Sequence, residues 1–266
     1  MIKDITIGQY IPGDSFVHKL DPRLKILISI IYMVDLFLMK NFIGYGLIIT
    51  FLIMVVFIAD LKFKYIYKGL KPIFILLIFT ALINIFMTKG GVLLFSWKFI
   101  KIYSEGVRIA IFMVIRLTLL IMGTSILTLT TSPIELTDGI EALLKPFKKI
   151  GLPAHELAMM MTIALRFIPT LMDETDKIMK AQKARGADFE NGSLIERGKN
   201  LMPLLVPLFI SSFRRADELS VAMESRCYRG GNGRTRMKQL KLCNKDYIAI
   251  ITFTIFILVT LCTRLV

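Results

Sequence analysis

Long stretches of the chain contain no charged residue, and they limit the folds available to it. Two of them run from residue 42 to 59 and from residue 72 to 88. An α-helix needs about 20 apolar residues to cross the hydrocarbon core of a bilayer, whereas a surface helix of a soluble domain keeps a polar face. Apolar side chains make up 55% of the 266 residues, which also exceeds the usual range for soluble domains. We therefore predict an all-α membrane protein.

About five membrane spans are expected. Four belong to an N-terminal membrane domain, residues 1–131, and the fifth lies in the C-terminal segment 247–266. The first span is short for a bilayer, so Leu24 and Lys25 would have to extend it by snorkelling toward the surface. Residues 92–103 are rich in aromatic and β-branched side chains and predict a short hairpin or interfacial loop. The predicted spans are 26–39, 42–59, 72–88, 107–131 and 247–262.

The segment 132–246 has a different composition. It holds 19 Lys/Arg and 14 Asp/Glu, and its longest uncharged run, 200–213, is too short to span a bilayer. We predict a coupling domain of amphipathic helices at 133–148, 154–186 and 193–229. Two helix starts have the capping-box pattern, Ser132 with Glu135 and Ser193 with Glu196. Prolines inside the second and third helices predict kinks, at Pro169, Pro203 and Pro207.

The two longest of these helices end in the same way. When the sequence is shifted by 41 residues, Arg185 falls on Arg226, and the small or apolar stripe before the first arginine falls on a similar stripe before the second. Spacings of three and four keep each stripe on one helix face. A cation at a helix C-terminus could simply offset the helix dipole, by roughly 0.3–1 kcal/mol. That alternative does not explain the shared stripe, so we favour docking of each guanidinium group into a protein pocket.

The distribution of basic residues predicts the orientation of the spans. With the N-terminus in the cytoplasm, the inner segments hold 27 Lys/Arg and the outer segments hold 5. Cytoplasmic segments of membrane proteins carry such an excess. The same distribution accounts for the net charge of +14, so nucleic-acid binding is not expected. The coupling domain is therefore predicted to be cytoplasmic.

The sequence contains no recognisable catalytic motif. His18 and His155 lie outside any nucleophile or zinc-protease pattern. The segment 192–200 resembles a phosphate-binding loop, but five residues separate its glycines where four are required, and Asn200 replaces the residue that would hold Mg²⁺. The three cysteines lack the spacing of a metal site or a disulfide framework. We expect no enzyme activity, no metal site and no cofactor.

Two further groups of residues lead to hypotheses. Asp35 and Arg116 lie inside predicted spans, where ionisable groups are costly, and we suggest that they form an ion pair. The three consecutive methionines from Met159 to Met161 are expected to pack against other residues. Methionine also suits a surface that contacts several partners, which stays open as an alternative.

With these features in view, the chain resembles the transmembrane component of energy-coupling factor transporters, the EcfT family, which is related to the cobalt transporter permease. The resemblance covers essentially the whole length. It rests on segments 8–23, 165–170 and 207–219 and on two three-residue motifs centred on arginine. The first motif, of the usual form, is Ala184, Arg185 and Gly186. The second departs from the usual Ala and Gly flanks and consists of Ser225, Arg226 and Cys227.

The resemblance implies that these six residues dock to two ABC-type ATPase subunits, while the long helices and the spans hold a small substrate-binding membrane subunit. ATP hydrolysis would then drive uptake of a vitamin or metal ion across a prokaryotic cell membrane, with membrane lipid around the spans. The alternatives are a conventional ABC permease whose own helices form the substrate path, a lipid enzyme, and a scaffold without energy coupling. The docking hypothesis expects Arg185 and Arg226 to lie near one another, on a surface that a cytosolic protein can reach.

Overall fold

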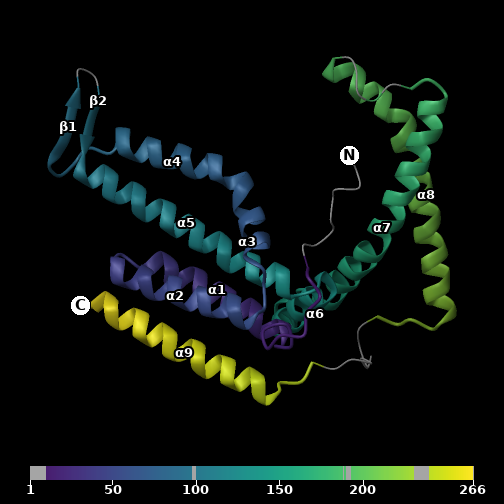
Figure 1. Ribbon diagram of the computed structural model, residues 1–266. Helices are drawn as coiled ribbons and strands as arrows, with labels where there is room; N and C mark the ends of the chain where they lie inside the picture. The colour runs from purple at the N-terminus through teal and green to yellow at the C-terminus, as the bar shows by residue number, and fades with distance from the viewer. Residues whose placement is uncertain (1–9, 98–99, 188, 190–192, 231–239, 266) are drawn as a thin grey trace. The chain divides into compact units, whose positions relative to one another are not determined.

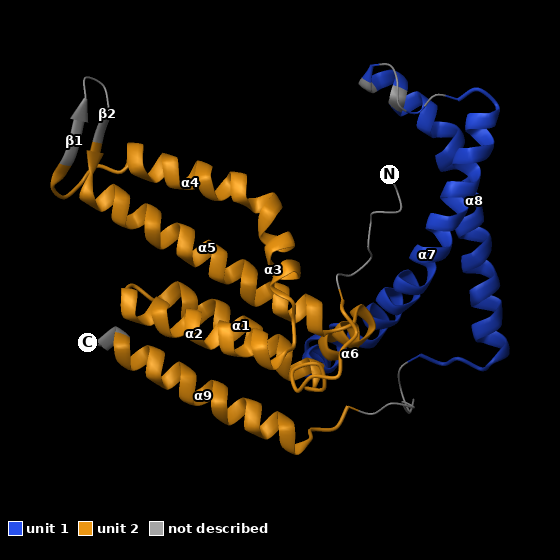
Figure 2. Ribbon diagram, in the orientation of Figure 1, with its two compact units in different colours: residues 1–7, 141–239 blue, residues 8–140, 240–266 orange. Residues whose placement is uncertain are grey.

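The computed structural model describes residues 10–97, 100–187, 189, 193–230 and 240–265. The chain divides into two compact units (Figure 2). The membrane unit consists of residues 8–140 and 240–266, and the coupling unit of residues 1–7 and 141–239. Figure 1 labels the α-helices and the strands. In chain order the elements are α1 (Pro22–Leu38), α2 (Phe42–Ile58), α3 (Phe63–Leu70), the 3-10 turn η2 (Lys71–Ile73), α4 (Phe74–Met87), β1 (Leu93–Trp97), β2 (Ile100–Tyr103), α5 (Ser104–Thr130), α6 (Pro133–Leu144), the 3-10 helix η3 (Lys145–Ile150), α7 (Ala154–Ala184), α8 (Leu194–Ser225) and α9 (Asn244–Leu265).

Three helical segments are long and apolar enough to cross a bilayer: Phe63–Met87, Ser104–Thr130 and Asn244–Thr263. Helices α1 and α2 contain 17 residues each, which is the lower limit of spanning length. The prediction of an all-α membrane protein is confirmed, while the number of spans stays a prediction. The start predicted at residue 72 for the third span was wrong, because the 3-10 turn η2 carries the helical chain through Pro72 from Phe63 onward.

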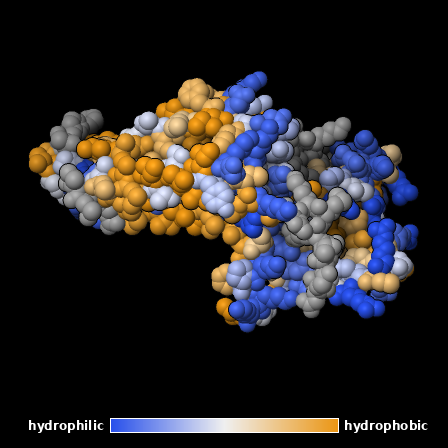
Figure 3. Space-filling model, turned by 90° about the horizontal axis from the view of Figure 1, so that it is seen from below, coloured by the Kyte–Doolittle hydropathy of each residue, from blue (hydrophilic) through white to orange (hydrophobic). Residues whose placement is uncertain are grey.

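The surface of the membrane unit is apolar, as expected of helices in contact with lipid. Large side chains of α4 are strongly exposed, among them Ile75 (79%) and Met87 (74%). In the view of Figure 3, hydrophobic residues cover most of the visible face of this unit. The predicted hairpin is confirmed: β1 and β2 pair antiparallel, with Trp97 opposite Ile100.

Helices α1 and α2 form the centre of the membrane unit, between α5 and α9, while α4 packs on α5 (Figure 1). The buried core includes Tyr32, Leu36, Tyr45 and Ile48. Gly123 of α5 allows α1 to approach closely, because a Cβ atom there would lie 2.3 Å from the ring of Tyr32. The Tyr32 hydroxyl donates a hydrogen bond to the Leu119 carbonyl at 2.9 Å. This contact fixes α1 against α5.

A buried polar network joins the starts of α1 and α9. Asp21 caps α1 by accepting a hydrogen bond from the Arg23 backbone N–H, and its own N–H donates to Asp246 at 2.9 Å. Asp246 also accepts from the Cys243 N–H, at 2.7 Å. Burial raises the pKa of Asp21, but hydrogen bonds from Arg23 and the charges of Arg23 and Lys25 outweigh it, so the pKa lies below its usual value. One network thus holds both helix ends in place.

The first helix begins four residues before the predicted span because Asp21 and Pro22 start it. Lys25 does not snorkel to the surface as predicted. Its side chain is buried, and its ammonium group donates to the His18 carbonyl at 3.0 Å and to the Thr130 carbonyl at 2.9 Å. Lys25 therefore ties α1 to the end of α5, where the last carbonyls of a helix lack partners within the helix.

The predicted ion pair between Asp35 and Arg116 was wrong. Asp35 instead contacts the Thr260 hydroxyl of α9, which lies 3.2 Å from both oxygens of its carboxyl group. Arg116 donates to the Tyr45 hydroxyl at 3.0 Å and to the Met39 carbonyl at 3.1 Å. The partners of Asp35 and Arg116 are thus uncharged hydroxyl and carbonyl groups.

The coupling unit contains α7 and α8. The capping box at Ser193 and Glu196 is confirmed in both directions. At Ser132, which lies in the membrane unit, the hydroxyl accepts from the Glu135 N–H at 3.3 Å. The helix predicted at 133–148 ends as an α-helix at Leu144, because Pro146 lacks the N–H that a continuing helix needs. Both long helices continue through their internal prolines.

Candidate docking site at two arginine-ended helices

Helices α7 and α8 pack against each other, and an ion pair joins them. An Arg215 guanidinium nitrogen lies 2.8 Å from a carboxylate oxygen of Glu174. Hydrogen bonds from Ser211 and from Arg215 hold the pKa of Glu174 below its usual value, against a smaller effect of burial. The sequence analysis did not identify this pair, although the two residues are separated by the same 41 positions that relate the two arginine motifs.

The first arginine motif forms the C-terminal cap of α7. Gly186 has a φ of 90°, and its N–H donates to the Lys183 carbonyl at 3.0 Å. The next N–H, of Ala187, donates to the Gln182 carbonyl at 3.0 Å. These two bonds define a Schellman motif, in which the residue after the cap adopts the left-handed conformation. Arg185 is the cap residue, and its side chain is exposed.

The second motif repeats this cap at the end of α8. The Cys227 N–H donates to the Glu224 carbonyl at 2.9 Å, and the Tyr228 N–H donates to the Met223 carbonyl at 3.0 Å. Cys227 has a φ of 55°, so it adopts the left-handed conformation that Gly186 adopts in the first motif. This cap ends α8 at Ser225, four residues before the predicted end. The unusual Ser and Cys flanks therefore leave the backbone of the motif unchanged.

Both arginines are available to a partner. Arg226, like Arg185, is an exposed cap residue, and within the described part of the chain neither guanidinium group has a hydrogen bond or an ion pair. Their backbone N–H groups form part of the helix caps. A cation that only offsets the helix dipole would need nothing more than this position at the helix end. Their free side chains are what the docking hypothesis requires.

The surroundings of Arg226 include a cavity of about 590 Å³ between α7 and α8. Arg166 and Phe167 of α7 line it, as do Arg229 and Tyr228 from the segment after α8. The Tyr228 hydroxyl also lies 3.5 Å from His155 at the start of α7. Arg166 and Arg229 were not predicted to lie beside Arg226. The end of α8 meets the first half of α7 through a tertiary contact, which has no signature in the sequence.

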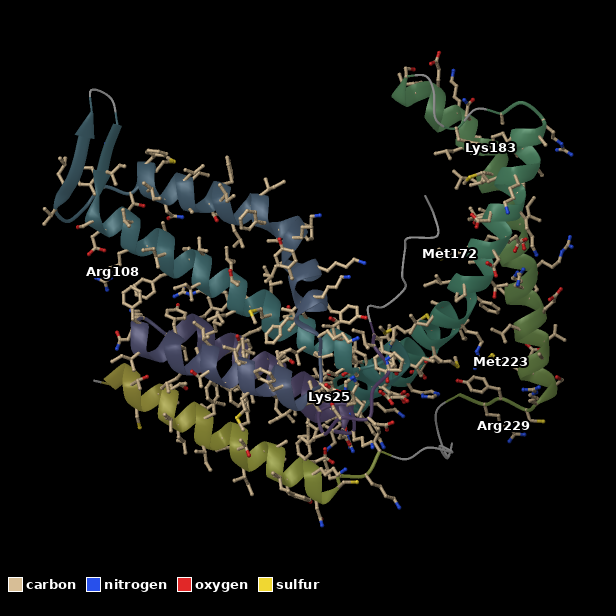
Figure 4. All side chains as sticks on the ribbon, in the orientation of Figure 1. Lys25, Arg108, Met172, Lys183, Met223 and Arg229 are labelled. Carbon is tan, nitrogen blue, oxygen red and sulfur yellow. The ribbon has the colours of Figure 1, made fainter. Side chains whose placement is uncertain are left out.

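Arg185 and Arg226 do not lie near one another, contrary to expectation. Arg226 shares its cavity with Arg166, which precedes Arg185 by 19 residues of α7, or about 28 Å of helix at 1.5 Å per residue. Figure 4 shows the same separation, with Lys183 and Met223 at opposite ends of the pair. The helices cross in opposite directions, so their C-terminal ends diverge. The expectation that the two arginines lie close together was therefore wrong.

The methionines near the start of α7 differ from one another. Met159 lines the cavity beside Arg226, whereas Met160 and Met161 are exposed by 55% and 43%. The expectation that all three pack was therefore wrong for the last two. Helix α8 also exposes large apolar side chains, including Met202, Phe209 and Phe213. These residues leave an apolar surface uncovered on the coupling unit.

Comparison with known proteins gives matches along the whole chain. The family model described as Cobalt transport protein, CbiQ, matches residues 13–238. The chain is 67% identical over 266 residues to the energy-coupling factor transporter transmembrane protein EcfT of Clostridium kluyveri, covering 100% of the chain and 98% of that protein. Proteins of the same name from Thermosediminibacter oceani and Bacillus subtilis are 59% identical over 250 residues and 50% identical over 255 residues, with 94% and 96% of each chain covered.

Proposed function

Because the chain belongs to the family of energy-coupling factor transporter transmembrane proteins, we propose that it is the coupling subunit of such a transporter. In this proposal two cytosolic ABC-type ATPase subunits bind the arginine ends of α7 and α8. A small substrate-binding membrane subunit binds the exposed apolar surface of α8 and the membrane unit. ATP hydrolysis by the ATPases drives uptake of a vitamin or metal ion, and this chain is itself non-catalytic.

The observation that carries the proposal is the pair of matched, exposed arginine caps. A guanidinium group presents five donors in a planar fork, which suits carboxylate or carbonyl acceptors in a partner's groove. The Schellman motif fixes the backbone at Arg185 and Arg226, so that each side chain is presented from a defined position. The two arginines lie apart, which removes the expectation of a compact docking surface, so the proposal assigns each arginine to its own ATPase subunit.

The contact between α7 and α8 supports a mechanical role. Packed helices move nearly as rigid bodies, so a displacement at one end reaches the other. The ion pair of Glu174 with Arg215 couples the helices near their crossing, between the two arginine ends. A movement of either ATPase would thus be transmitted to the apolar surface around Phe209 and Phe213 and to the membrane subunit bound there.

The alternative of a conventional ABC permease has less support. It requires polar groups in the spans that are free to contact a substrate. Asn84 donates to the Thr80 carbonyl at 2.8 Å, Asp35 contacts Thr260, and Arg116 donates to two oxygen atoms. These polar groups therefore serve contacts within the unit.

The proposed orientation has the N-terminus and the coupling unit in the cytoplasm of a prokaryotic cell. It rests on the excess of Lys and Arg in the segments before α1, between α2 and α4, and between α6 and α9. The same orientation brings Arg185 and Arg226 to the side on which ATP is available.

The test uses Arg185→Ala, Arg226→Ala and the double variant in the complete transporter. We expect each single variant to weaken recovery of the ATPase subunits with the chain, or to leave ATP hydrolysis without uptake, while membrane insertion is retained. Arg214→Ala is the matched control, because Arg214 is an exposed arginine of α8 outside both caps. Wild-type uptake by the double variant would reject the docking mechanism.

A further inference from the structure

The membrane unit has a partly open cavity of about 520 Å³ at one end of its helix bundle. The lining comes from residues 25–32 of α1, the first half of α9, the second halves of α2 and α5, and residues of the loop before α1. Most lining side chains are apolar, including Phe16, Phe51, Ile126 and Phe253. A volume of this size is in the range of pockets that hold small ligands.

Four of the five polar side chains in the lining already have hydrogen-bond partners within the unit. The Tyr32 hydroxyl donates to Leu119, and the Lys25 ammonium donates to two carbonyls. The hydroxyls of Thr130 and Thr252 donate to the carbonyls of Ile126 and Ile248. Among the lining residues, all of which are described, Ser29 is the remaining polar side chain. A bound water needs two to four polar partners, so the cavity favours an apolar occupant over water or a polar ligand.

The charge near the cavity does not favour an anionic headgroup inside it. Lys25 is close enough to interact with the carboxylates of Glu135, Asp246 and Asp21, which oppose its positive charge. An acidic group entering the cavity would meet these carboxylates without water to screen them. The occupant must therefore leave any charged part outside.

We infer that this cavity binds one hydrocarbon chain of a membrane lipid, with the lipid headgroup outside the cavity. The exterior of α4 and α9 is apolar, so lipid chains surround this unit. A chain that enters the cavity contacts the apolar side chains of four helices and stays clear of the Lys25 network. The lipid comes from the leaflet at the end of the unit where α1 and α9 begin. This inference does not depend on docking of the ATPases.

The test uses the full-length chain in nanodiscs that contain phosphatidylglycerol with a photoreactive diazirine at the end of one acyl chain. After irradiation, mass spectrometry locates the labelled residues. We expect labelling of α5 between Gly123 and Thr130, whose lining residues are buried or half-buried and so are poorly reached by surrounding lipid. Ala249→Phe places a phenyl ring in the lining, so labelling of this α5 segment should fall several-fold.

Ile251→Phe is the matched control, because Ile251 is 59% exposed on the same helix and does not line the cavity. In the Ile251→Phe variant the lipid probe should label α5 as strongly as in the wild type. Thr252→Leu fills the cavity less and serves as a second variant if Ala249→Phe does not fold. Equal labelling of α5 in the filled variants and the wild type would overturn the inference. So would loss of wild-type labelling on assembly with a membrane subunit, because the cavity would then hold protein.

Discussion

Glu174 and Arg215 are separated by 41 residues in the sequence and form an ion pair at 2.8 Å. The same offset relates Arg185 to Arg226 and Gly186 to Cys227. Equivalent positions of two repeats meet in this way when an approximate two-fold axis passes between them. In α7 the motif arginine lies 11 residues after Glu174, and in α8 it lies 11 residues after Arg215. Each distance is about 16 Å of helix, and the two helices run in opposite directions. The symmetry of the contact thus explains the separation of the two candidate docking ends.

The ion pair leads to a prediction about pH. The pKa of Glu174 is lowered in the folded chain, first by the hydrogen bond from Ser211 and then by the contact with Arg215, so its contribution to the free energy of unfolding is present above the usual carboxyl pKa and is lost as pH falls through the lowered value. Both side chains are partly exposed, which limits the expected contribution to about 0.5 kcal/mol. Glu174→Gln should therefore lower the melting temperature slightly at pH 7, with a difference from wild type that vanishes in acid.

A double-mutant cycle with Arg215→Gln measures the pairwise term separately from each side chain's other contacts. The control is Asp217→Asn, a neutralised exposed carboxylate on α8. A coupling energy of zero at pH 7, or a Glu174→Gln effect that persists at low pH, would contradict an ion pair that stabilises the helix crossing.

The two capping motifs predict that substitutions at the equivalent positions Gly186 and Cys227 change helix stability in opposite directions. A residue with a side chain costs about 1 kcal/mol in the left-handed conformation, whereas glycine adopts it freely. Cys227→Gly should therefore stabilise the end of α8, and Gly186→Ala should destabilise the end of α7 by a similar amount. A Cβ atom at Gly186 would meet nothing within 4 Å, so the cost there is conformational and not steric.

Hydrogen exchange of the last helical turns measures both effects at the site. Gly198 provides a control, since it lies inside α8 and also has open space around its Cα. Gly198→Ala should stabilise α8, because alanine favours a helix interior over glycine by about 1 kcal/mol. If Gly186→Ala proved as stabilising as Gly198→Ala, the proposed cap geometry would be incorrect.

The sequence predicted the features that depend on apolar runs, on a repeat or on a short local motif. Long apolar runs predicted most helices of the membrane unit, the Ser193 and Glu196 spacing predicted a capping box, and the 41-residue shift identified both arginine caps. Partners that depend on tertiary contact were not predictable. Charge alone suggested that Asp35 should pair with Arg116. In the structure Asp35 contacts a hydroxyl of α9 and Arg116 donates to a main-chain carbonyl, which avoids the desolvation of a buried pair of charges. The burial of Lys25 likewise depends on carbonyls of α5 and a loop.

Lys25 is expected to be necessary for the stability of the membrane unit. Lys25→Met removes two hydrogen bonds, leaves the carbonyls of His18 and Thr130 without this donor, and removes the positive charge near Asp21 and Asp246. Breaking a buried, hydrogen-bonded charge arrangement typically costs about 3 kcal/mol or more. We expect a large drop in the thermal unfolding temperature of the purified chain. Lys64→Met, at an exposed lysine of α3, should leave that temperature nearly unchanged, and a similar drop in both variants would contradict a specific role of Lys25.

The contact between Asp35 and Thr260 predicts which of the two side chains supplies the shared hydrogen. The Thr260 hydroxyl lies 2.9 Å from the Ile257 carbonyl of its own helix and 3.2 Å from both oxygens of Asp35. A hydroxyl has one hydrogen to donate, and a buried ionised carboxylate without a cation is costly. Within the described residues no basic side chain forms an ion pair with Asp35. We therefore expect a neutral Asp35 that donates to Thr260, while Thr260 donates to Ile257.

An amide can replace a neutral carboxyl group in this arrangement, so Asp35→Asn should change the free energy of unfolding little. Asp35→Leu leaves the buried Thr260 oxygen without its donor, and Thr260→Val removes the partner of Asp35, so each should cost about 1–3 kcal/mol. Thr254→Val is the control, because the Thr254 hydroxyl makes the same type of bond, to Ile250, on the exposed face of α9. Thermal unfolding of the four variants in one detergent gives the comparison. A loss in Asp35→Asn as large as in Asp35→Leu would mean that the charged form of Asp35 is the one the fold requires.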